Sequence, residues 1–512
     1  MLNAVAGSRS RGMVMLFGLS RNTPNKFKAC TSQSVRFFSV QGQDVFVQKF
    51  GGTSLGTPEK MEKVKNIVQK FHGENKGQVV AVVSALSSDT KAEGTTSRLL
   101  AAAAAAVNGG EFNTFLDKIE DTHMDVIYGL LKGKENRDNT KAYVISELNR
   151  VRTFCESLSV IQELSPRSHD LIIGCGERLS AGLLAGVLRE NGTESVMVDL
   201  SDAFPNGLDT GRRGYHLEAK KTFKPLLEPL VNKGVVPVVT GFFGRIKGGI
   251  IKDIGRGYTD LTSALCAGAL GAKQLQVWKE SDGVFTGNPT KIEKATLLNL
   301  VTPGEAAELT YFGNEVLHPF TMGCCIEDQV PIAILNTFKP DGQGTRVINA
   351  EKEELAKRPG KFGIAAVCSK SSIPLLNMTS RGNLEAHQYP SKVFEAFARH
   401  KVKADLISTS MSNLTVTIHE STSKSQIDAV VADLEEFAHC ELEMNKAIVS
   451  CIGVGMRHQK GIAAKVFEAL SEGGVNIEMI SQGASEINIA VVIDAEDMNK
   501  AIHLIHEEFL ER

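Results

Sequence analysis

The sequence predicts an α/β protein in which a mostly parallel sheet is followed by two smaller α+β units. One observation is a set of nearly continuous apolar runs that alternate with helical patterns, at 44–50, 78–85, 235–241 and 273–280. Strands covered on both faces of a parallel sheet have this composition. The other observation is an internal repeat in the last part of the chain, where each copy reads as strand, helix, strand and strand.

The elements of the first part follow from their own patterns. The apolar run at 44–50 ends in glycines, so we expect a strand followed by a turn. Residues 58–71 show helical periodicity, with a proline in the first turn. Residues 111–170 contain no strand-like run and are expected to form a helical insertion, and the six alanines at 101–106 are expected in a packed helix.

The repeat rests on matches that keep one spacing. The sequence KVFEA occurs at 392–396 and again at 465–469. Matching residues at the same offset are Val402 and Val475, Ile407 and Ile480, and Ser408 and Ser481. Each copy is therefore expected to form one split βαβ unit.

These observations predict the domain organisation. A polar, turn-rich segment, 339–361, separates the repeat from the first part and is predicted to be a linker. The predicted domains are an N-terminal extension at 1–43, a first domain at 44–338, and repeat units at 362–436 and 445–512.

Composition excludes several classes of function. The formal net charge of -2 over 512 residues gives no indication of a nucleic-acid partner. No run of 18 apolar residues occurs, so we expect no membrane span. The nine cysteines form no C-x-x-C pair, which argues against a zinc site or a disulfide framework and favours a reducing compartment.

The N-terminal segment 1–43 differs from the rest of the chain. It contains no Asp or Glu but six basic residues and several Ser and Thr, a composition typical of an organelle transit peptide. The sequence RFFS at 36–39 resembles a mitochondrial processing site. We therefore expect the mitochondrial matrix; a plastid, or a disordered extension of a cytoplasmic protein, is the alternative.

Four segments of the first domain combine glycines with polar side chains: KFGGTS at 49–54, GCGERLS at 174–180, TGFFGRIKGG at 240–249 and IGRGYTDLTSA at 254–264. We expect each at a strand-to-helix junction, with Glu177 opening a helix and Asp260 in a first turn. Each segment alone is explained equally well by a tight turn, a helix cap or a solvated charge. Four together favour a ligand site.

The lysine of the first segment precedes its glycines, whereas the familiar phosphate loop places its lysine after them. This order and the other motifs resemble the aspartate kinases of the amino acid kinase family. VQKFGGTSL at 47–55, GFFG at 241–244, GRGYTD at 255–260, DGVFTGNP at 282–289 and YFGNEVLHP at 311–319 appear in the family's order. The resemblance covers about residues 44–512, is nearest to fungal members, and identifies the repeat units as tandem ACT domains. The implied fold is the amino acid kinase sandwich.

The resemblance implies roles for individual residues. Lys49 would reach the phosphates of ATP, and Asp260 would order Lys49. Glu177 would bind the amino group of aspartate and Arg256 a carboxylate, with Thr96 and Thr259 also at the substrate. The implied ATP site comprises Lys49, Gly51, Gly52, Ser54, Lys279, Glu280, Phe285, Asn288 and Lys291. Mg²⁺ would accompany ATP, held mostly by phosphates and water rather than by protein ligands.

Two departures from the family pattern affect this transfer. Glu315 stands where many bacterial members have a lysine, and we hypothesise that Lys291 replaces it. The segment 377–394 is longer than the usual first ACT loop. The implied effector pocket comprises Met378, Ala404 and Asp405.

The implied activity is that of an ATP-dependent aspartate kinase, which makes 4-phospho-aspartate on the way to lysine, threonine, methionine and isoleucine. A carboxylate nucleophile needs no general base, and the four segments contain no histidine. We expect feedback inhibition, with threonine favoured as effector, and a homo-oligomer. The alternatives are another amino acid kinase and a non-catalytic amino-acid sensor.

Overall fold

The computed structural model describes residues 44–75, 78–88, 93–211, 214–255, 257–313, 317–349, 351–355, 357–358, 360–382 and 387–511. Predictions on the segment 1–43, on Arg256 and on Glu315 lie outside these residues.

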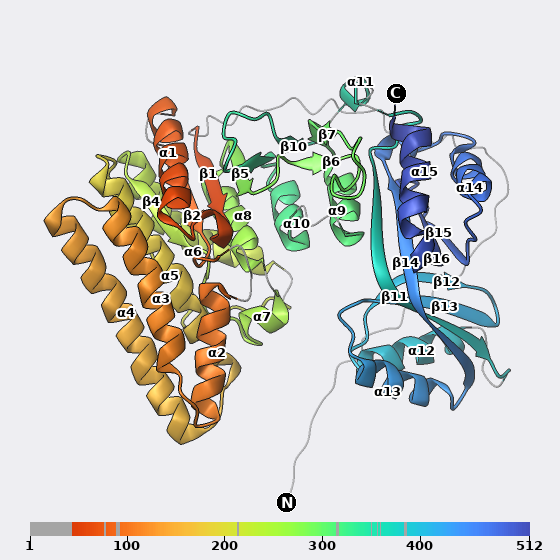
Figure 1. The fold of residues 1–512 in the computed structure, drawn as a ribbon, viewed down its shortest axis with the longest axis horizontal. Coiled ribbons are helices and arrows are strands. Elements are labelled where there is room, and N and C mark those ends of the chain that lie inside the picture. The colour runs from red at the N-terminus through yellow and green to blue at the C-terminus, as the bar shows by residue number, and fades with distance from the viewer. Residues whose placement is uncertain are drawn as a thin grey trace, which may run out of the picture. The chain divides into compact units, whose positions relative to one another are not determined.

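The first domain is built on an eight-stranded sheet with the order β3-β4-β2-β1-β5-β9-β10-β8 (Figure 1). The strands are β1 (Phe46–Phe50), β2 (Val79–Val83), β3 (Ser195–Val198), β4 (Val236–Thr240), β5 (Gln274–Lys279), β8 (Leu300–Val301), β9 (Ile332–Asn336) and β10 (Thr345–Val347). All neighbouring pairs are parallel except β9 and β10. The predicted mostly parallel sheet is therefore confirmed.

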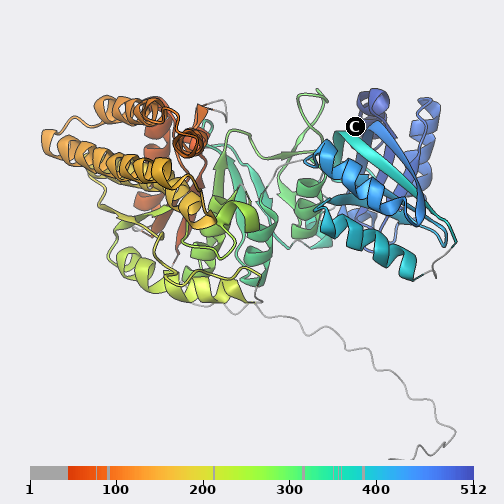
Figure 2. The same ribbon diagram turned by 90° about the horizontal axis from the view of Figure 1, so that it is seen from below.

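Helices cover both faces of this sheet, and alternate residues of the strands divide between two cores. In β1, Val47 packs with α6 (Tyr215–Asn232) and α8 (Tyr258–Leu270), whereas Phe50 packs on the other face. That other face is covered by α1 (Pro58–Glu74), α2 (Thr95–Val107), α3 (Asn113–Leu130), α4 (Lys134–Ile161) and α5 (Pro166–Glu190). Figure 2 shows the strands between the orange helices and the yellow-green helix α6.

The predicted helical insertion is present as α3 and α4, but the prediction for Glu177 is wrong. Glu177 does not open a helix; it lies in the interior of α5, which begins at Pro166 with Ser165 as its N-cap. The flanking glycines serve close packing instead. A Cβ at Gly176 would lie 2.8 Å from Ala85 Cβ, and one at Gly174 would lie 2.9 Å from the ring of Phe242.

α5 is also, among the described residues, the one helix long and apolar enough to cross a membrane. Within the protein, however, 89% of its most apolar window is buried. It is therefore the central core helix of the first domain.

The segment predicted as a linker, 339–361, contains strand β10 and the short helix α11 (Lys352–Leu355). β10 pairs with β8 and β9, so the first part of this segment belongs to the first sheet. With only three residues, in which exposed Arg346 separates buried Thr345 and Val347, β10 is too short to stand out among turn residues.

The last part of the chain forms one antiparallel sheet of six strands with the order β12-β13-β11-β14-β16-β15. Two strands are long, β11 (Ala366–Ser380) and β14 (Ala438–Ile452). The others are β12 (Ala404–Thr409), β13 (Asn413–Ile418), β15 (Met479–Gln482) and β16 (Asn488–Asp494). The helices are α12 (Gln388–Arg399), α13 (Lys424–Leu434), α14 (Ile462–Glu472) and α15 (Met498–Leu510).

The two repeat units exchange strands instead of following each other along the chain. The second half of β11 pairs with β13 and with the first half of β14, and these strands share a core with α12 and α13. The first half of β11 pairs with the second half of β14, which pairs with β16 and shares a core with α14 and α15. An irregularity between Lys370 and Leu375 separates the halves of β11. The predicted bounds follow chain order because periodicity does not reveal strand pairing.

Candidate active site

A cleft of about 290 Å³ opens at the carboxyl ends of β1 and β2, the edge where parallel α/β sheets bind ligands. Five of the predicted site residues line it: Lys49, Gly51, Gly52, Thr96 and Thr259. Further lining comes from the residues after β2, the start of α2 and the short helix α7 (Ile250–Asp253).

Lys49 and Asp260 form an ion pair at the base of this cleft. Lys49 Nζ lies 2.8 Å from Asp260 Oδ1, and the two side chains are only 11% and 10% exposed. Burial alone would raise the pKa of Asp260, but the charges of Lys49 and Lys279 outweigh it and hold that pKa below its ordinary value. Asp260 therefore stays ionised and fixes the lysine ammonium at the end of β1.

The glycine pair after Lys49 combines two different constraints. A Cβ at Gly52 would lie 2.1 Å from the carbonyl oxygen of Ala85, so this position permits no side chain. A Cβ at Gly51 would meet nothing closer than Lys49 Nζ, at 3.7 Å. Gly52 thus sets the close approach of the β1 and β2 turns, while Gly51 leaves open space beside the ammonium.

Glu177 lies behind the cleft wall with a side chain that is almost completely buried. Tyr258, which lines the cleft, donates a hydrogen bond of 2.6 Å from its hydroxyl to Glu177 Oε1. Glu177 Oε2 has no hydrogen-bond partner among the described residues. Burial raises the pKa of Glu177 to about 7, although the Tyr258 hydrogen bond opposes this. The free oxygen is available to a buried cationic group.

The residues assigned to the nucleotide have varied surroundings. Lys279 ends β5, which lies beside β1, and its charge acts on Asp260. Glu280 accepts a hydrogen bond from the Thr53 hydroxyl at the cleft. Ser54 is fully buried, with its hydroxyl 3.1 Å from Thr337 Oγ1, and therefore does not line the cleft. Phe285 belongs to a short strand, β6 (Val284–Phe285), outside the main sheet.

Asn288 and Lys291 line a second, small cavity with residues of β11 and α15. Lys291 Nζ lies 3.5 Å from Ser369 Oγ on β11. Lys291 therefore lies against β11 of the six-stranded sheet, and its proposed replacement of a cation at 315 stays a prediction.

The predicted effector residues are buried or half-buried in this structure. Met378 is fully buried in the core of the first repeat unit, and Ala404 is half-buried at the start of β12. Asp405 pairs with Lys370 at 3.2 Å, with the two side chains 1% and 9% exposed.

Sequence reasoning missed two residues near the cleft. Tyr258 stands in the GRGYTD motif between two predicted site residues, Arg256 and Thr259, so the motif itself could have indicated it. His318 Nε2 donates a hydrogen bond of 3.1 Å to the carbonyl oxygen of Ile254. A Cβ at Gly257 would lie 3.2 Å from Cδ2 of the His318 ring, so the ring packs against this glycine. Only the tertiary structure brings it to the loop before α8.

The fold and this cleft define a kinase of the amino acid kinase family, whose family model matches residues 44–336. An ACT domain model matches residues 449–509. The chain is 38% identical to an aspartokinase of Schizosaccharomyces pombe, over 91% of this chain and 92% of that protein. It is 37% identical to an aspartokinase of Saccharomyces cerevisiae, over 91% and 92%.

Solved structures similar to this chain belong to the same class of protein as these relatives. Aspartokinase III of E. coli in complex with aspartate and ADP superimposes with a TM-score of 0.74 at 26% identity, covering 90% of this chain and 99% of that one. The same enzyme in complex with lysine and aspartate gives a TM-score of 0.72 at 25% identity, with coverage of 92% and 100%. The chain therefore belongs to the amino acid kinase family and, within it, to the aspartokinases.

The two glycines give a matched pair of variants. Gly52→Ala should destabilise the fold by roughly 1–3 kcal/mol, because the added methyl group overlaps the Ala85 carbonyl. Gly51→Ala should fold normally, since the φ of Gly51 is -73° and the methyl group has room. It should slow turnover by on the order of 10²-fold by displacing a phosphate beside Lys49. Thermal unfolding and kcat measure both effects, and a stable, fully active Gly52→Ala variant would contradict the packing argument.

Proposed function

We propose that the cleft transfers the γ-phosphoryl group of ATP to the β-carboxylate of aspartate, giving ADP and 4-phospho-aspartate. The observation that carries this proposal is the buried pair of Lys49 and Asp260 beside the open space at Gly51. Phosphoryl transfer depends mainly on positioning and on charge stabilisation, which a fixed cation supplies. The attacking carboxylate is already ionised, so no residue has to remove a proton.

Each group in the cleft then has a distinct role. Lys49 contacts the phosphates of ATP, and Asp260 holds its ammonium in place. Glu177 binds the ammonium of aspartate through the oxygen that Tyr258 leaves free. Thr96 and Thr259 contact the substrate from the cleft wall. Arg256, outside the described residues, binds a substrate carboxylate by resemblance.

Mg²⁺ would accompany ATP and neutralise charge on its phosphates. No group of three or more His, Cys, Asp or Glu side chains in the described parts of the chain could hold a metal ion. Magnesium commonly keeps several waters and binds substrate phosphates. We therefore propose that ATP and water supply most of the ligands of the ion.

Helix α9 (Pro303–Tyr311) supports regulation by the last part of the chain, because three of its residues, spaced three apart, contact that part. Buried Glu305 accepts hydrogen bonds from the Val454 N–H at 2.7 Å and from Arg358 at 2.8 and 2.9 Å. Glu308 accepts one from Asn488 at 2.8 Å.

The third residue, Tyr311, ends α9 at the first repeat unit. Its hydroxyl donates to the carbonyl oxygens of Ala404 and Asp405 at 3.2 and 3.0 Å. Lys370, which pairs with Asp405, lies 4.8 Å from the centre of the Tyr311 ring. Beyond α9 the chain reaches His318, which contacts the loop before α8. Tyr311 and His318 thus contact Asp405 and the loop before α8, respectively.

We propose threonine as the effector and a homo-oligomer as the assembly, both from the resemblance to fungal aspartokinases. Ile407 and Ile480 occupy matched positions on β12 and β15, the two edge strands of the regulatory sheet. They are 44% and 48% exposed, and β12 and β15 contact each other within the chain, so the two isoleucines offer an exposed apolar surface that supports association. A sedimentation measurement that gives the mass of a single chain would contradict the oligomer.

The pH dependence of aspartate use tests the role of Glu177. Only the ionised carboxylate attracts an ammonium, so kcat/KM for aspartate should rise as the pH increases through the Glu177 pKa of about 7 and then level off. Glu177→Gln should raise KM for aspartate roughly 10- to 100-fold and remove this pH limb. KM for ATP is the internal control. Identical pH profiles for the variant and the wild type would exclude Glu177 from aspartate binding.

A threonine titration tests the α9 contact. Tyr311→Phe removes both hydrogen bonds to the first repeat unit, so half-inhibition should need roughly fivefold more threonine or higher, with the uninhibited rate unchanged. Tyr128→Phe is the matched control, since Tyr128 likewise contacts a lysine, Lys141, but lies on α3. Unchanged sensitivity in Tyr311→Phe would exclude this contact, and a wild type that neither threonine nor lysine inhibits would exclude sensing.

The mitochondrial matrix is our proposed location. It rests on the composition of residues 1–43, which lie outside the described part of the chain. A fluorescent fusion of the full chain should enter mitochondria, whereas one that lacks residues 1–39 should stay in the cytosol with unchanged kinase activity. A diffuse cytosolic signal from the full chain would refute this location.

A further inference from the structure

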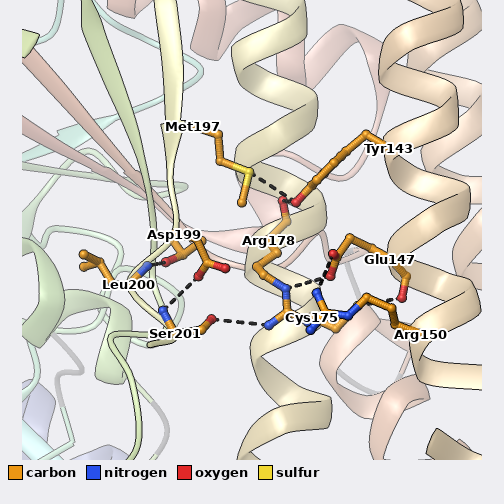
Figure 3. Close-up of polar contacts among 10 residues, drawn as sticks. Tyr143, Glu147, Arg150, Cys175, Arg178, Met197, Asp199, Leu200 and Ser201 are labelled. Atoms are coloured by element: carbon orange, nitrogen blue, oxygen red, sulfur yellow. Dashed lines mark hydrogen bonds and ion pairs between the residues drawn. The ribbon is translucent and has the colours of Figure 1, made fainter. Parts of the chain in front are cut away.

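Arg178 follows Glu177 on α5 and is nearly as deeply buried, at 6% exposure. It does not line the cleft, and the roles proposed above leave it unused. Arg178 Nε donates to Glu147 Oε2 at 2.7 Å, and Nη1 donates to Ser201 Oγ at 3.3 Å. Figure 3 shows the guanidinium between α4, which carries Glu147, and the segment after β3, which carries Ser201.

The backbone of Arg178 is held as well as its side chain. The Tyr143 hydroxyl on α4 lies 3.2 Å from the carbonyl oxygen of Arg178 and the same distance from Met197 Sδ (Figure 3). Glu147 is fixed in turn by Arg150, which donates to its Oε1 at 2.8 Å. Contacts from α4 therefore hold both the backbone of Arg178 and the carboxylate of Glu147.

α4 also approaches α5 so closely that side chains are excluded. A Cβ at Gly182 would lie 2.3 Å from Tyr143 Cε1, and one at Gly186 would lie 2.6 Å from Thr140 Oγ1. On the cleft side, Ser180 accepts a hydrogen bond of 3.0 Å from the Leu86 N–H. α5 is thus held between the helical insertion and the cleft wall, and Arg178 supplies the charged contact on the insertion side.

We propose that Arg178, paired with Glu147, is a positioning residue that orients α5 so that Glu177 Oε2 faces the ammonium of the substrate. This inference rests on the proposed role of Glu177 in binding that ammonium. It assigns a function to the helical insertion, which contributes none of the predicted site residues.

Charge provides an independent readout of this arrangement. The groups that bear on the Glu177 carboxylate are the Tyr258 hydroxyl from α8, the Ala85 N–H after β2, and Arg178 and Cys175 on α5 itself. Arg178 favours the ionised form of Glu177, and Glu147 partly cancels its charge. Removing the cation should raise the pKa of Glu177, whereas removing the Glu147 charge should lower it.

The test measures kcat/KM for aspartate against pH in Arg178→Met and Glu147→Gln. The pH limb should move to higher pH in Arg178→Met and to lower pH in Glu147→Gln. KM for aspartate should rise roughly tenfold in both, with KM for ATP unchanged. Arg152→Met is the matched control, because Arg152 also extends from α4 but pairs with Asp117 and Glu120 instead of α5. Arg152→Met should change neither the position of the pH limb nor KM for aspartate.

Glu147→Gln leaves the buried Arg178 guanidinium without its carboxylate partner and can fail to fold, whereas in Arg178→Met the Glu147 carboxylate keeps its ion pair with Arg150. The double variant Arg178→Met with Glu147→Leu leaves no such charge and should stay folded, yet should still show the raised KM for aspartate. A normal KM for aspartate in the folded double variant would overturn the proposal, as would limbs that move in the same direction in the single variants. If Glu177→Gln itself leaves KM for aspartate unchanged, the proposed ammonium site is wrong and the positioning role falls with it.

Discussion

The ion pair between Lys49 and Asp260 is the contact on which the candidate active site depends. Each partner is largely buried, so each would carry a large desolvation penalty without the other. The parallel sheet makes the pair possible, because it brings the carboxyl end of β1 to the start of α8. The turn at Gly51 and Gly52, the cleft and the assigned phosphate position are all arranged around this fixed cation.

The second half of the site depends on α5, which passes through the centre of the domain. Its glycines permit close contact on two sides, with Ala85 and Phe242 on one side and with Tyr143 of α4 on the other. This packing keeps Glu177 away from water and raises its pKa. The same close packing lets the ion pair between Arg178 and Glu147 act on the orientation of Glu177.

The proposed regulation depends on a sheet that both repeat units share. Because β11 and β14 each contribute to both units, each of these strands runs from one unit into the other. α9 contacts both units along one face, and His318, further along the chain, contacts the loop before α8. A ligand that favours one arrangement of this sheet therefore has a physical route to the cleft, provided that it binds the two arrangements with different affinity.

The sequence by itself determined the parallel sheet, the helical insertion, the repeat and the segments that surround the cleft. Apolar runs, helical periodicity and glycine-rich turns are local patterns, so the strands, helices and turns could be predicted from them. The site residues Lys49, Gly51, Gly52, Thr96 and Thr259 are assigned by resemblance to the aspartate kinases. Only the tertiary structure decided which distant groups meet. It placed Glu177 inside a helix, Lys291 against β11 and Arg178 on Glu147, and it exchanged strands between the repeat units. Strand pairing and burial depend on the whole chain, and they determine which charges are paired and which pKa values shift.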